Sequence, residues 1–496
     1  MARRVHMEPS RTLTEFRLLP GLTTRETSIE HVTLATPLVL RPEGGAIPLT
    51  TPVLAAAMQS VSGSRMGIEL ARLGGAAVIY CSQPIPDEAA MVAKIKAHKA
   101  GFVEPRAIGP NDLLRDVDAL RRTAGYSTFP VVDSKGRLLG LITRRDYDAR
   151  IHGDVPAKER MVPRAQLNVG VEITDLEAAN GLLIEGHRSV LPIVDREDRL
   201  LSLVFRKDIE DHLDNPDQVV DEKKRLLAVA AINTHDYHER VAALVEAGVD
   251  VLVIDSSDGH TAFQHETLEW IRRRAPHLPV IGGNVITGEG FDYLVASGAG
   301  AVKVGMGGGS ICITQEQKGT GRGLATAVMK VVEARDRHRA KTGIHVPVIA
   351  DGGIVNSKDV VIALALGADA VMMGRFFARL EESPTETVRI NDRVMKPYWG
   401  EGSARAREWS PARYRQAAFV EGVEGFVEYA GKLRDNLPLL VSKVKAALSS
   451  CGCRTIAELH ANAELELVSA LAIREGKVHD ILQLGGEVDS LSSWSS

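Results

Sequence analysis

The sequence has few cysteines and little net charge. Only four cysteines occur among 496 residues, too few for a disulfide framework in so long a chain, so a reducing cytoplasm is the expected location. The 60 lysines and arginines nearly balance 64 acidic residues, which gives a net charge of −4. No strong overall field therefore favours nucleic acid or a membrane as partner, while acidic or phosphorylated small ligands remain compatible with local sites.

Long apolar segments and a familiar nucleotide motif are also missing. No run of about 18 apolar residues occurs, so we expect no membrane span. The first residues include basic side chains without an apolar stretch behind them, and we expect no signal peptide. No Gly-x-Gly-x-x-Gly fingerprint follows the first predicted strand, which disfavours an open dinucleotide-binding sheet.

Short apolar segments that end in small or polar residues recur along the chain. Such segments are typical of parallel strands, which are buried on both faces. Helical patterns fill most gaps between them, most plainly at 240–247, 264–274, 325–341 and 358–366. This alternation predicts an α/β fold, a (β/α)8 TIM barrel, with an open doubly wound sheet as the alternative. The predicted strands are 52–58, 76–81, 228–233, 251–256, 279–285, 301–307, 347–353 and 370–376.

One gap between predicted strands is far longer than a helix requires, and it contains an internal repeat. About 145 residues separate the second strand from the third. Two segments recur 62 residues later with a similar sequence. Residues 130–133 resemble residues 192–195, and residues 137–146 resemble residues 199–208. Each copy predicts a strand, a tight turn, a second strand and a polar helix start. We therefore expect a first barrel part (1–102), an inserted pair of copies (103–214, divided into about 103–155 and 156–214) and a second barrel part (215–496).

The inserted copies resemble a tandem of CBS (cystathionine β-synthase-type) modules over roughly residues 103–214. Paired modules of that family often bind nucleotides, so the resemblance implies an adenine or guanine nucleotide as a ligand of this unit. The alternative is an insertion with a purely structural role. Either is compatible with a barrel, because the entropy of loop closure grows only slowly with loop length.

In such a barrel the active site lies at the carboxyl ends of the strands, where this chain places its glycine-rich and polar segments. After the sixth strand, a glycine-rich turn leads directly to Ser310 and Cys312. Glycines let backbone groups converge on a ligand, and N–H dipoles make a nearby cysteine more reactive. Cys312 is therefore the candidate nucleophile. Cys81, at the end of a buried strand, fits the role of a small apolar side chain.

The loops after the seventh and eighth strands predict a phosphate cradle. Gly353 and Gly374 offer backbone N–H donors and Arg375 adds a guanidinium, at the place where barrels often bind phosphate. Asp351 is too acidic to face a phosphate, and we expect it to accept hydrogen bonds from a ribose diol. The alternative is that these glycines only close tight turns.

Several segments together resemble the IMP (inosine 5'-monophosphate) dehydrogenase family, over nearly the whole chain. The cysteine loop alone is shared with GMP (guanosine 5'-monophosphate) reductase, so it indicates only the wider superfamily. Arg413-Tyr414 looks like the catalytic pair on the mobile flap of the dehydrogenases, which the reductases lack. The segments that carry the resemblance are 18–23, 57–63, 307–314, 350–354, 373–375 and 398–403.

The resemblance implies an NAD+-dependent oxidation of IMP to xanthosine monophosphate (XMP), a step of guanine nucleotide biosynthesis. Cys312 would attack the base carbon between the two pyrimidine nitrogens, hydride would pass to NAD+, and water would hydrolyse the covalent thioimidate. Arg413 and Tyr414 are implied to act in the hydrolysis, with the arginine as general base, although a guanidinium hardly deprotonates near neutral pH. Thr314 with a nearby carboxylate is the second route for the proton.

The resemblance also implies the ligand contacts. The phosphate and ribose contacts are Ser310, Asp351, Gly353, Gly374, Arg375 and Tyr398. The base contacts are Gly400, Glu401, Gly402 and Glu421. The dinucleotide contacts are Asp255, Ser256, Ser257, Asn284, Gly305 and Gly307. A monovalent cation, K+, is implied at the carbonyls of Gly307, Gly309 and Cys312, with Glu475, Gly476 and Lys477 supplied by a neighbouring subunit of a homotetramer.

Two other functions remain open at this point. A GMP reductase would catalyse an NADPH-dependent deamination on the same scaffold. The presence of Arg413-Tyr414 disfavours this function, because the reductases lack that pair. A nucleotide sensor with a degenerate barrel would work through the inserted pair alone. The presence of Cys312, Thr314 and Asp351 speaks against that alternative.

Overall fold

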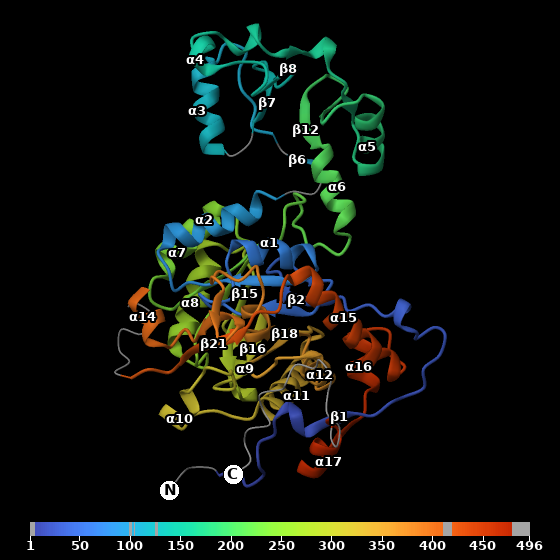
Figure 1. Cartoon of the computed structure of the whole chain (residues 1–496), viewed down its shortest axis with the longest axis vertical. Coiled ribbons are helices and arrows are strands. Elements are labelled where there is room, and N and C mark those ends of the chain that lie inside the picture. The colour runs from blue at the N-terminus through green and yellow to red at the C-terminus, as the bar shows by residue number, and fades with distance from the viewer. Residues whose placement is uncertain (1–4, 99–101, 104, 125–126, 410–418, 479–496) are drawn as a thin grey trace.

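A closed barrel of eight parallel strands forms the larger part of the molecule, as the sequence predicts (Figure 1). The computed structural model describes residues 5–98, 102–103, 105–124, 127–409 and 419–478. The strands follow one another around the barrel in chain order, and the last strand pairs with the first, which closes the barrel. They are β4 (Val53–Ala55), β5 (Ala76–Ile79), β13 (Val229–Ile232), β14 (Val251–Ile254), β15 (Val280–Val285), β16 (Ala301–Val304), β17 (Val348–Asp351) and β18 (Ala370–Met373).

Alternate residues of each barrel strand enter two different cores. In β14, Val251 and Val253 belong to the core inside the barrel, whereas Leu252 and Ile254 pack outward against the helices. All four are completely buried. Burial on both faces explains why these strands are continuously apolar in the sequence. Each strand is shorter than its predicted range, mostly because the last predicted residues belong to the loop that follows, and β15 differs only by beginning one residue later.

Helices surround the barrel, and all four that the sequence shows most plainly are present, with ends within three residues of the predicted ones. The eighth position of the ring is filled by a helix from the C-terminal part, α15, which packs against α12 and α1. No helix in the described ranges is long and apolar enough to cross a membrane. The ring helices are α1 (Ser64–Arg72), α2 (Ile85–Lys96), α7 (Tyr237–Ala247), α8 (Ala262–Arg274), α9 (Gly288–Ala296), α11 (Leu324–Thr342), α12 (Ser357–Ala365) and α15 (Leu433–Ser450).

A β-hairpin that the sequence analysis did not anticipate covers the amino-terminal end of the barrel. Its strands are β2 (Thr36–Leu40) and β3 (Ala46–Leu49), and Leu38 and Leu49 enter the core inside the barrel. The Thr36 hydroxyl donates to the Asp369 carbonyl (2.8 Å), just before β18. The Leu40 N–H donates to the Gly300 carbonyl (3.0 Å), just before β16. Since this end is plugged, a ligand site can open only at the carboxyl end.

The inserted copies form two small sheets, which lie above the barrel in Figure 1. Each copy contains the expected hairpin, and both hairpins have their register shift at equivalent positions, at Val131/Val132 and Ile193/Val194. In the second copy a helix, α6, follows directly, whereas the first copy has only a turn at that place. The hairpins are β7 (Thr128–Val132) with β8 (Leu138–Thr143) and β11 (Val190–Val194) with β12 (Leu200–Phe205), and α6 is Arg206–Asp214.

Candidate functional site

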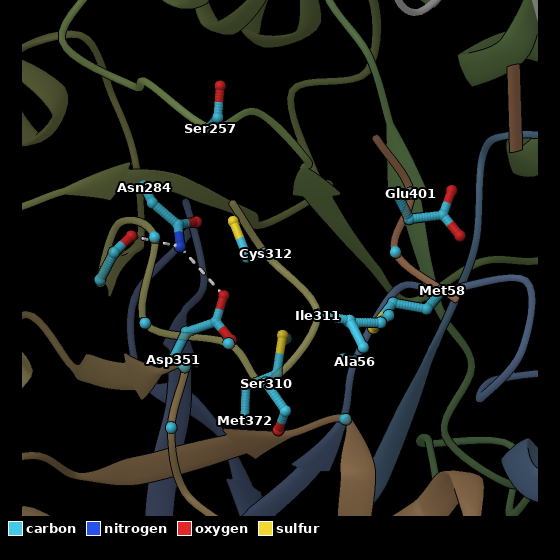
Figure 2. A pocket seen from close by; sticks show the side chains of 18 of the residues that line it. Ala56, Met58, Ser257, Asn284, Ser310, Ile311, Cys312, Asp351, Met372 and Glu401 are labelled. Atoms are coloured by element: carbon cyan, nitrogen blue, oxygen red, sulfur yellow. Dashed lines mark hydrogen bonds between the residues drawn. The ribbon is translucent and has the colours of Figure 1, made fainter. Parts of the chain in front are cut away.

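A cavity of about 210 Å³ opens at the carboxyl end of the barrel strands (Figure 2). Its walls come from the carboxyl ends of six of the eight strands and the loops that follow them, and from the later segments 398–402 and 421. The sequence placed its candidate residues at these strand ends, and the structure brings them together. The predicted residues that line the cavity are Asp255, Ser256, Ser257, Asn284, Gly305, Gly307, Gly309, Ser310, Cys312, Thr314, Asp351, Gly353, Gly374, Arg375, Tyr398, Gly400, Glu401, Gly402 and Glu421.

The glycine-rich turn after β16 brings Cys312 to the middle of the cavity (Figure 2). Gly305 has φ +139°, and a Cβ there would lie 1.8 Å from the Asp351 carbonyl oxygen, so only glycine fits. The turn is closed by the Cys312 N–H, which donates to the Gly309 carbonyl (3.1 Å). Cys312 is half-buried and faces the cavity, whereas Cys81 is 1% exposed inside the barrel core. The two cysteines thus occupy the different environments that their sequence contexts predict.

A chain of polar side chains begins at Cys312, and its next two members also line the cavity. The Thr314 Oγ1 lies 3.2 Å from the Cys312 Sγ and donates to the Glu421 carboxylate (3.1 Å). Lys318 pairs with the other Glu421 oxygen at 2.8 Å. Thr314 and Lys318 are four residues apart on the short helix α10 (Thr314–Lys318), so both face the same carboxylate. The nearby carboxylate expected for Thr314 is Glu421.

Asp351, at the end of β17, is held by two buried side chains. The Lys303 ammonium lies 2.7 Å from its carboxylate, and the Asn284 amide donates to the same oxygen at 3.0 Å. Lys303 also donates to the Asn284 side-chain oxygen. Lys303 lines the cavity but was missed by sequence analysis. The signal was available, because a lysine inside an otherwise apolar barrel strand requires a buried partner.

The residues predicted to contact a phosphate lie together in the wall of the cavity: Ser310, Gly353, Gly374, Arg375 and Tyr398. A Cβ at Gly374 would lie 2.8 Å from the Tyr398 hydroxyl, so the glycine lets the tyrosine approach the backbone. Burial raises the pKa of Tyr398 well above its usual value and keeps the hydroxyl a neutral donor. A guanidinium, a phenol and glycine N–H groups form a suitable donor set for a phosphate.

Glu401 lines the cavity, and its carboxylate is held by two residues that do not line it. One oxygen accepts the Gln59 N–H (2.6 Å), and the other accepts the Ser82 hydroxyl. In Figure 2 the Glu401 side chain lies apart from Cys312, on the far side of the cavity. Because both carboxylate oxygens accept a hydrogen bond, the Glu401 side chain is held in one orientation beside the cavity.

Where the sequence predicts dinucleotide contacts, the loop after β14 is joined to Asn284 near the end of β15. The Asn284 N–H donates to the Ser256 carbonyl (3.0 Å), and the Gly259 N–H donates to the Asn284 carbonyl (2.7 Å). Asp255, Ser256 and Ser257 line the cavity beside this junction. A carboxylate and two hydroxyls suit the ribose hydroxyls of a dinucleotide, so the donor set fits NAD.

Two groups of predicted residues remain, and only one of them falls within the described residues. Arg413 and Tyr414 lie outside the described residues. Glu475 ends the helix α17 (Ala470–Glu475), with Gly476 and Lys477 directly after it, and this segment contacts the short 3-10 helix η1 (Leu13–Glu15). The structure describes one chain, and in that chain the segment does not line the cavity.

Comparison with known proteins places the chain in one family. Residues 10–479 match the family described as "IMP dehydrogenase / GMP reductase domain". The inosine-5'-monophosphate dehydrogenase of Tritrichomonas foetus is 46% identical, over 96% of this chain and 97% of its own length. The Escherichia coli enzyme of the same name is 37% identical, over 88% and 90%. A crystal structure of a Trypanosoma brucei GMP reductase variant with guanosine 5'-monophosphate superposes with a TM-score of 0.81 at 28% identity, covering 96% of this chain and 99% of that one. The chain belongs to the IMP dehydrogenase / GMP reductase family.

Proposed function

We propose that this chain is an NAD+-dependent oxidoreductase that converts IMP to XMP, with Cys312 as the nucleophile. The observation that carries the proposal is the position of Cys312 in the cavity, 3.2 Å from the Thr314 hydroxyl and between the phosphate-type and dinucleotide-type walls. Relatives that are named inosine-5'-monophosphate dehydrogenases match nearly the full chain, which supports the same reaction here.

The first half of the reaction forms a covalent bond to the substrate. The phosphate would bind between Ser310, Gly374 and Arg375, and the ribose diol would bind to Asp351, which fixes the base above Cys312. The thiolate adds to the base carbon between the two pyrimidine nitrogens, and the hydrogen on that carbon leaves with its electron pair. NAD+ bound beside Asp255 supplies the hydride acceptor. The remaining thioimidate divides one difficult step into two easier ones.

The second half hydrolyses the thioimidate. Water adds to the base carbon, its proton is removed, and the Cys312 thiolate leaves as XMP forms. Thr314 can accept that proton while it passes its own to the ionised Glu421 carboxylate 3.1 Å away. Arg413 and Tyr414 are proposed to join this step, as the family resemblance implies.

Three further properties are part of this proposal. Backbone carbonyls are suitable ligands for K+, and those of Gly307, Gly309 and Cys312 lie on one tight turn. The inserted unit is proposed to be a CBS pair over residues 103–214 that binds an adenine or guanine nucleotide. A homotetramer would bring residues 475–477 of one subunit to the cysteine loop of the next.

A GMP reductase is the second candidate, because a solved reductase with bound guanosine 5'-monophosphate shares this fold over nearly the whole chain. The two activities differ in cofactor and direction. NADPH oxidation that requires GMP, in the absence of NADH formation from IMP, would assign the chain to the reductases instead.

The test is an absorbance assay for NADH with purified protein, IMP, NAD+ and K+. We expect steady NADH formation that depends on IMP. The variant C312A should lose turnover by more than about 1,000-fold, because the nucleophile is gone, while it still binds IMP measurably. C451A is the matched control, since Cys451 is also a half-buried free thiol but does not line the cavity. Steady turnover in C312A would contradict the covalent mechanism.

A further inference from the structure

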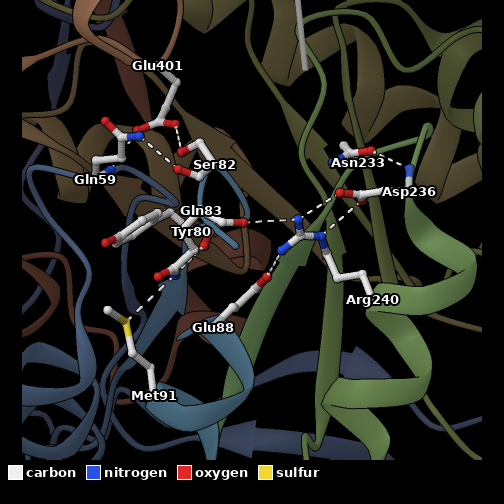
Figure 3. Close-up of polar contacts among 10 residues, drawn as sticks. All are labelled: Gln59, Tyr80, Ser82, Gln83, Glu88, Met91, Asn233, Asp236, Arg240 and Glu401. Atoms are coloured by element: carbon white, nitrogen blue, oxygen red, sulfur yellow. Dashed lines mark hydrogen bonds and ion pairs between the residues drawn. The ribbon is translucent and has the colours of Figure 1, made fainter. Parts of the chain in front are cut away.

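We propose that Gln59 and Ser82 are positioning residues that determine the specificity for the purine base, by clamping the Glu401 carboxylate. We call Gln59, Ser82 and Glu401 the Glu401 clamp (Figure 3). The inference rests on the proposed function, since it concerns the loop that would hold the base of IMP. Neither Gln59 nor Ser82 lines the cavity, so both would act through Glu401.

The clamp fixes both oxygens of one buried carboxylate from two different barrel loops. Gln59 follows β4 and donates its backbone N–H to one oxygen at 2.6 Å. Ser82 follows β5 and donates its hydroxyl to the other oxygen. Hydrogen bonds to a charged acceptor are about twice as strong as neutral ones, and two donors fix its orientation as well as its position. The loop that carries Glu401 is therefore tied to the barrel at two points.

Gln59 also connects the other parts of the clamp. Its amide nitrogen donates to the Ser82 carbonyl (2.8 Å), and its amide oxygen accepts the Trp399 indole N–H (2.9 Å). Gln59 is only 6% exposed, and its side chain uses both donor and acceptor groups within the protein. A buried polar network whose members are satisfied is rigid, because any displacement leaves a polar group without a partner.

The turn that carries Ser82 is itself anchored to the start of α7 (Figure 3). Arg240 donates to the Gln83 carbonyl at 3.2 Å and pairs with Glu88 and with Asp236. Arg240 and Glu88 are both almost completely buried. Burial raises the pKa of Glu88, and the pairing with Arg240 opposes that rise. The outer end of the clamp is thus fixed to a helix that is itself held by buried ion pairs.

The clamped loop is joined on its other side to the cysteine loop. The Gly402 carbonyl accepts the Glu421 N–H (3.1 Å), and the Glu421 carbonyl accepts the Ile313 N–H (3.1 Å). The Gly400 N–H donates to the Val423 carbonyl (3.1 Å). The loop at 400–402 therefore lies between the clamp and the segment that pairs with the nucleophile's loop. Movement at Glu401 would shift the base-binding backbone relative to Cys312.

The backbone of this loop offers one N–H donor to the proposed base, that of Gly402. Within the described part of the chain, the Gly402 N–H makes no hydrogen bond. A 6-oxopurine presents a carbonyl acceptor to such a donor, whereas a 6-aminopurine presents a second donor and is disfavoured. A precisely held loop therefore distinguishes IMP from AMP, which has the same ribose phosphate but a different base edge. Loosening the clamp should reduce that discrimination.

The decisive variant is S82A, which removes one donor of the clamp without touching the cavity. We expect KM for IMP to rise about 10-fold, since one hydrogen bond to a charged group is lost, while KM for NAD+ stays within about twofold. The ratio of the AMP and IMP dissociation constants, measured by calorimetry, should fall by a similar factor. S383A is the matched control, because Ser383 is a comparably buried serine whose hydroxyl bonds two carbonyls away from the cavity.

A double-mutant cycle with E401Q separates this role from a general loss of stability. If Ser82 acts through Glu401, S82A should change IMP affinity by less than about twofold in the E401Q background. Equal effects of S82A on IMP and AMP, or an S82A protein that behaves like S383A, would overturn the clamp. Wild-type protein that binds IMP in calorimetry without oxidising it would overturn the proposed function, and the binding ratios would still decide on the clamp.

Discussion

Lys303 places a positive charge inside the barrel, beside Asp351, for which we propose a ribose contact. The residue is 3% exposed, and its ammonium is shared between the Asp351 carboxylate and the Asn284 side-chain oxygen. Burying an ammonium is costly unless it is paired and hydrogen-bonded, and here both conditions hold. With one Asp351 oxygen engaged by Lys303 and Asn284, the other remains available for a ligand hydroxyl. Lys303 thus orients a residue that is proposed to bind the ribose.

The variant K303M tests this role. We expect a loss of roughly 2–3 kcal/mol in the free energy of unfolding, because Asp351 would keep a partly buried charge without its cation. KM for IMP should rise about 10-fold, since the carboxylate is no longer held in one orientation. Urea denaturation and steady-state kinetics measure the two effects. K330M is the control, since Lys330 pairs with Glu333 on the exposed surface, and a K303M protein indistinguishable from it would contradict the assignment.

At the scale of single elements, the features that could be predicted from the sequence are those that depend only on residues close together in the chain. The barrel strands are buried on both faces, so each one is visible as a local apolar segment. The cysteine loop could be predicted from the sequence as well, because the glycines and Cys312 directly follow one strand. The Glu401 clamp could not be predicted, since Gln59 and Ser82 meet Glu401 only after the barrel closes. The Arg240–Glu88 pair joins residues 152 positions apart and depends on the same closure.

The packing of α16 (Ile456–Asn462) against the barrel gives a pH-dependent prediction. His460 on this helix contacts the Ala368 carbonyl through Nε2 (3.0 Å), and burial lowers the pKa of His460. Below about pH 6.5 the unfolded chain binds a proton at His460 that the folded protein still excludes. The free energy of unfolding should therefore fall as the pH drops from about 7.5 toward 5.

The variant H460Q isolates this contribution, because glutamine keeps a donor for the carbonyl and does not titrate. The difference in unfolding free energy between wild type and H460Q should change with pH. As the pH falls, the unfolding free energy of the wild type should decrease more than that of H460Q. Denaturant unfolding at about half-unit pH steps measures this difference. A constant difference across the range would show that the folded state protonates His460 as readily as the unfolded chain does.

At the scale of the whole molecule, the inserted unit and the barrel have separate cores. Phe129 and Val131 belong to one small core of the insertion, and Leu191 and Ile193 belong to another. The two hairpin turns bind each other, since the Leu138 N–H donates to the Asp198 carbonyl and the Leu200 N–H to the Gly136 carbonyl. This reciprocal contact ties the copies into one unit and makes no use of the barrel.

We therefore expect that replacing residues 103–214 with a short Gly-Ser linker leaves a folded and active barrel. Every residue that lines the cavity lies outside this range. Lys96, at the end of α2, keeps both of its partners, Asp221 (2.8 Å) and Asp250 (2.6 Å), because neither belongs to the insertion. The ion pair that is lost, Arg72 with Asp211, is partly exposed and contributes about 1 kcal/mol or less.

The turnover number of the shortened chain should stay within about threefold of the full chain, since closing a loop of different length changes the entropy only slowly. Steady-state NADH formation and thermal unfolding of both chains measure the outcome. Insoluble or unfolded protein would show that the insertion is structurally required. A folded protein that lost activity, with IMP still bound in calorimetry, would indicate that the inserted unit controls catalysis through the ends of α2 and α6, the elements that join it to the barrel.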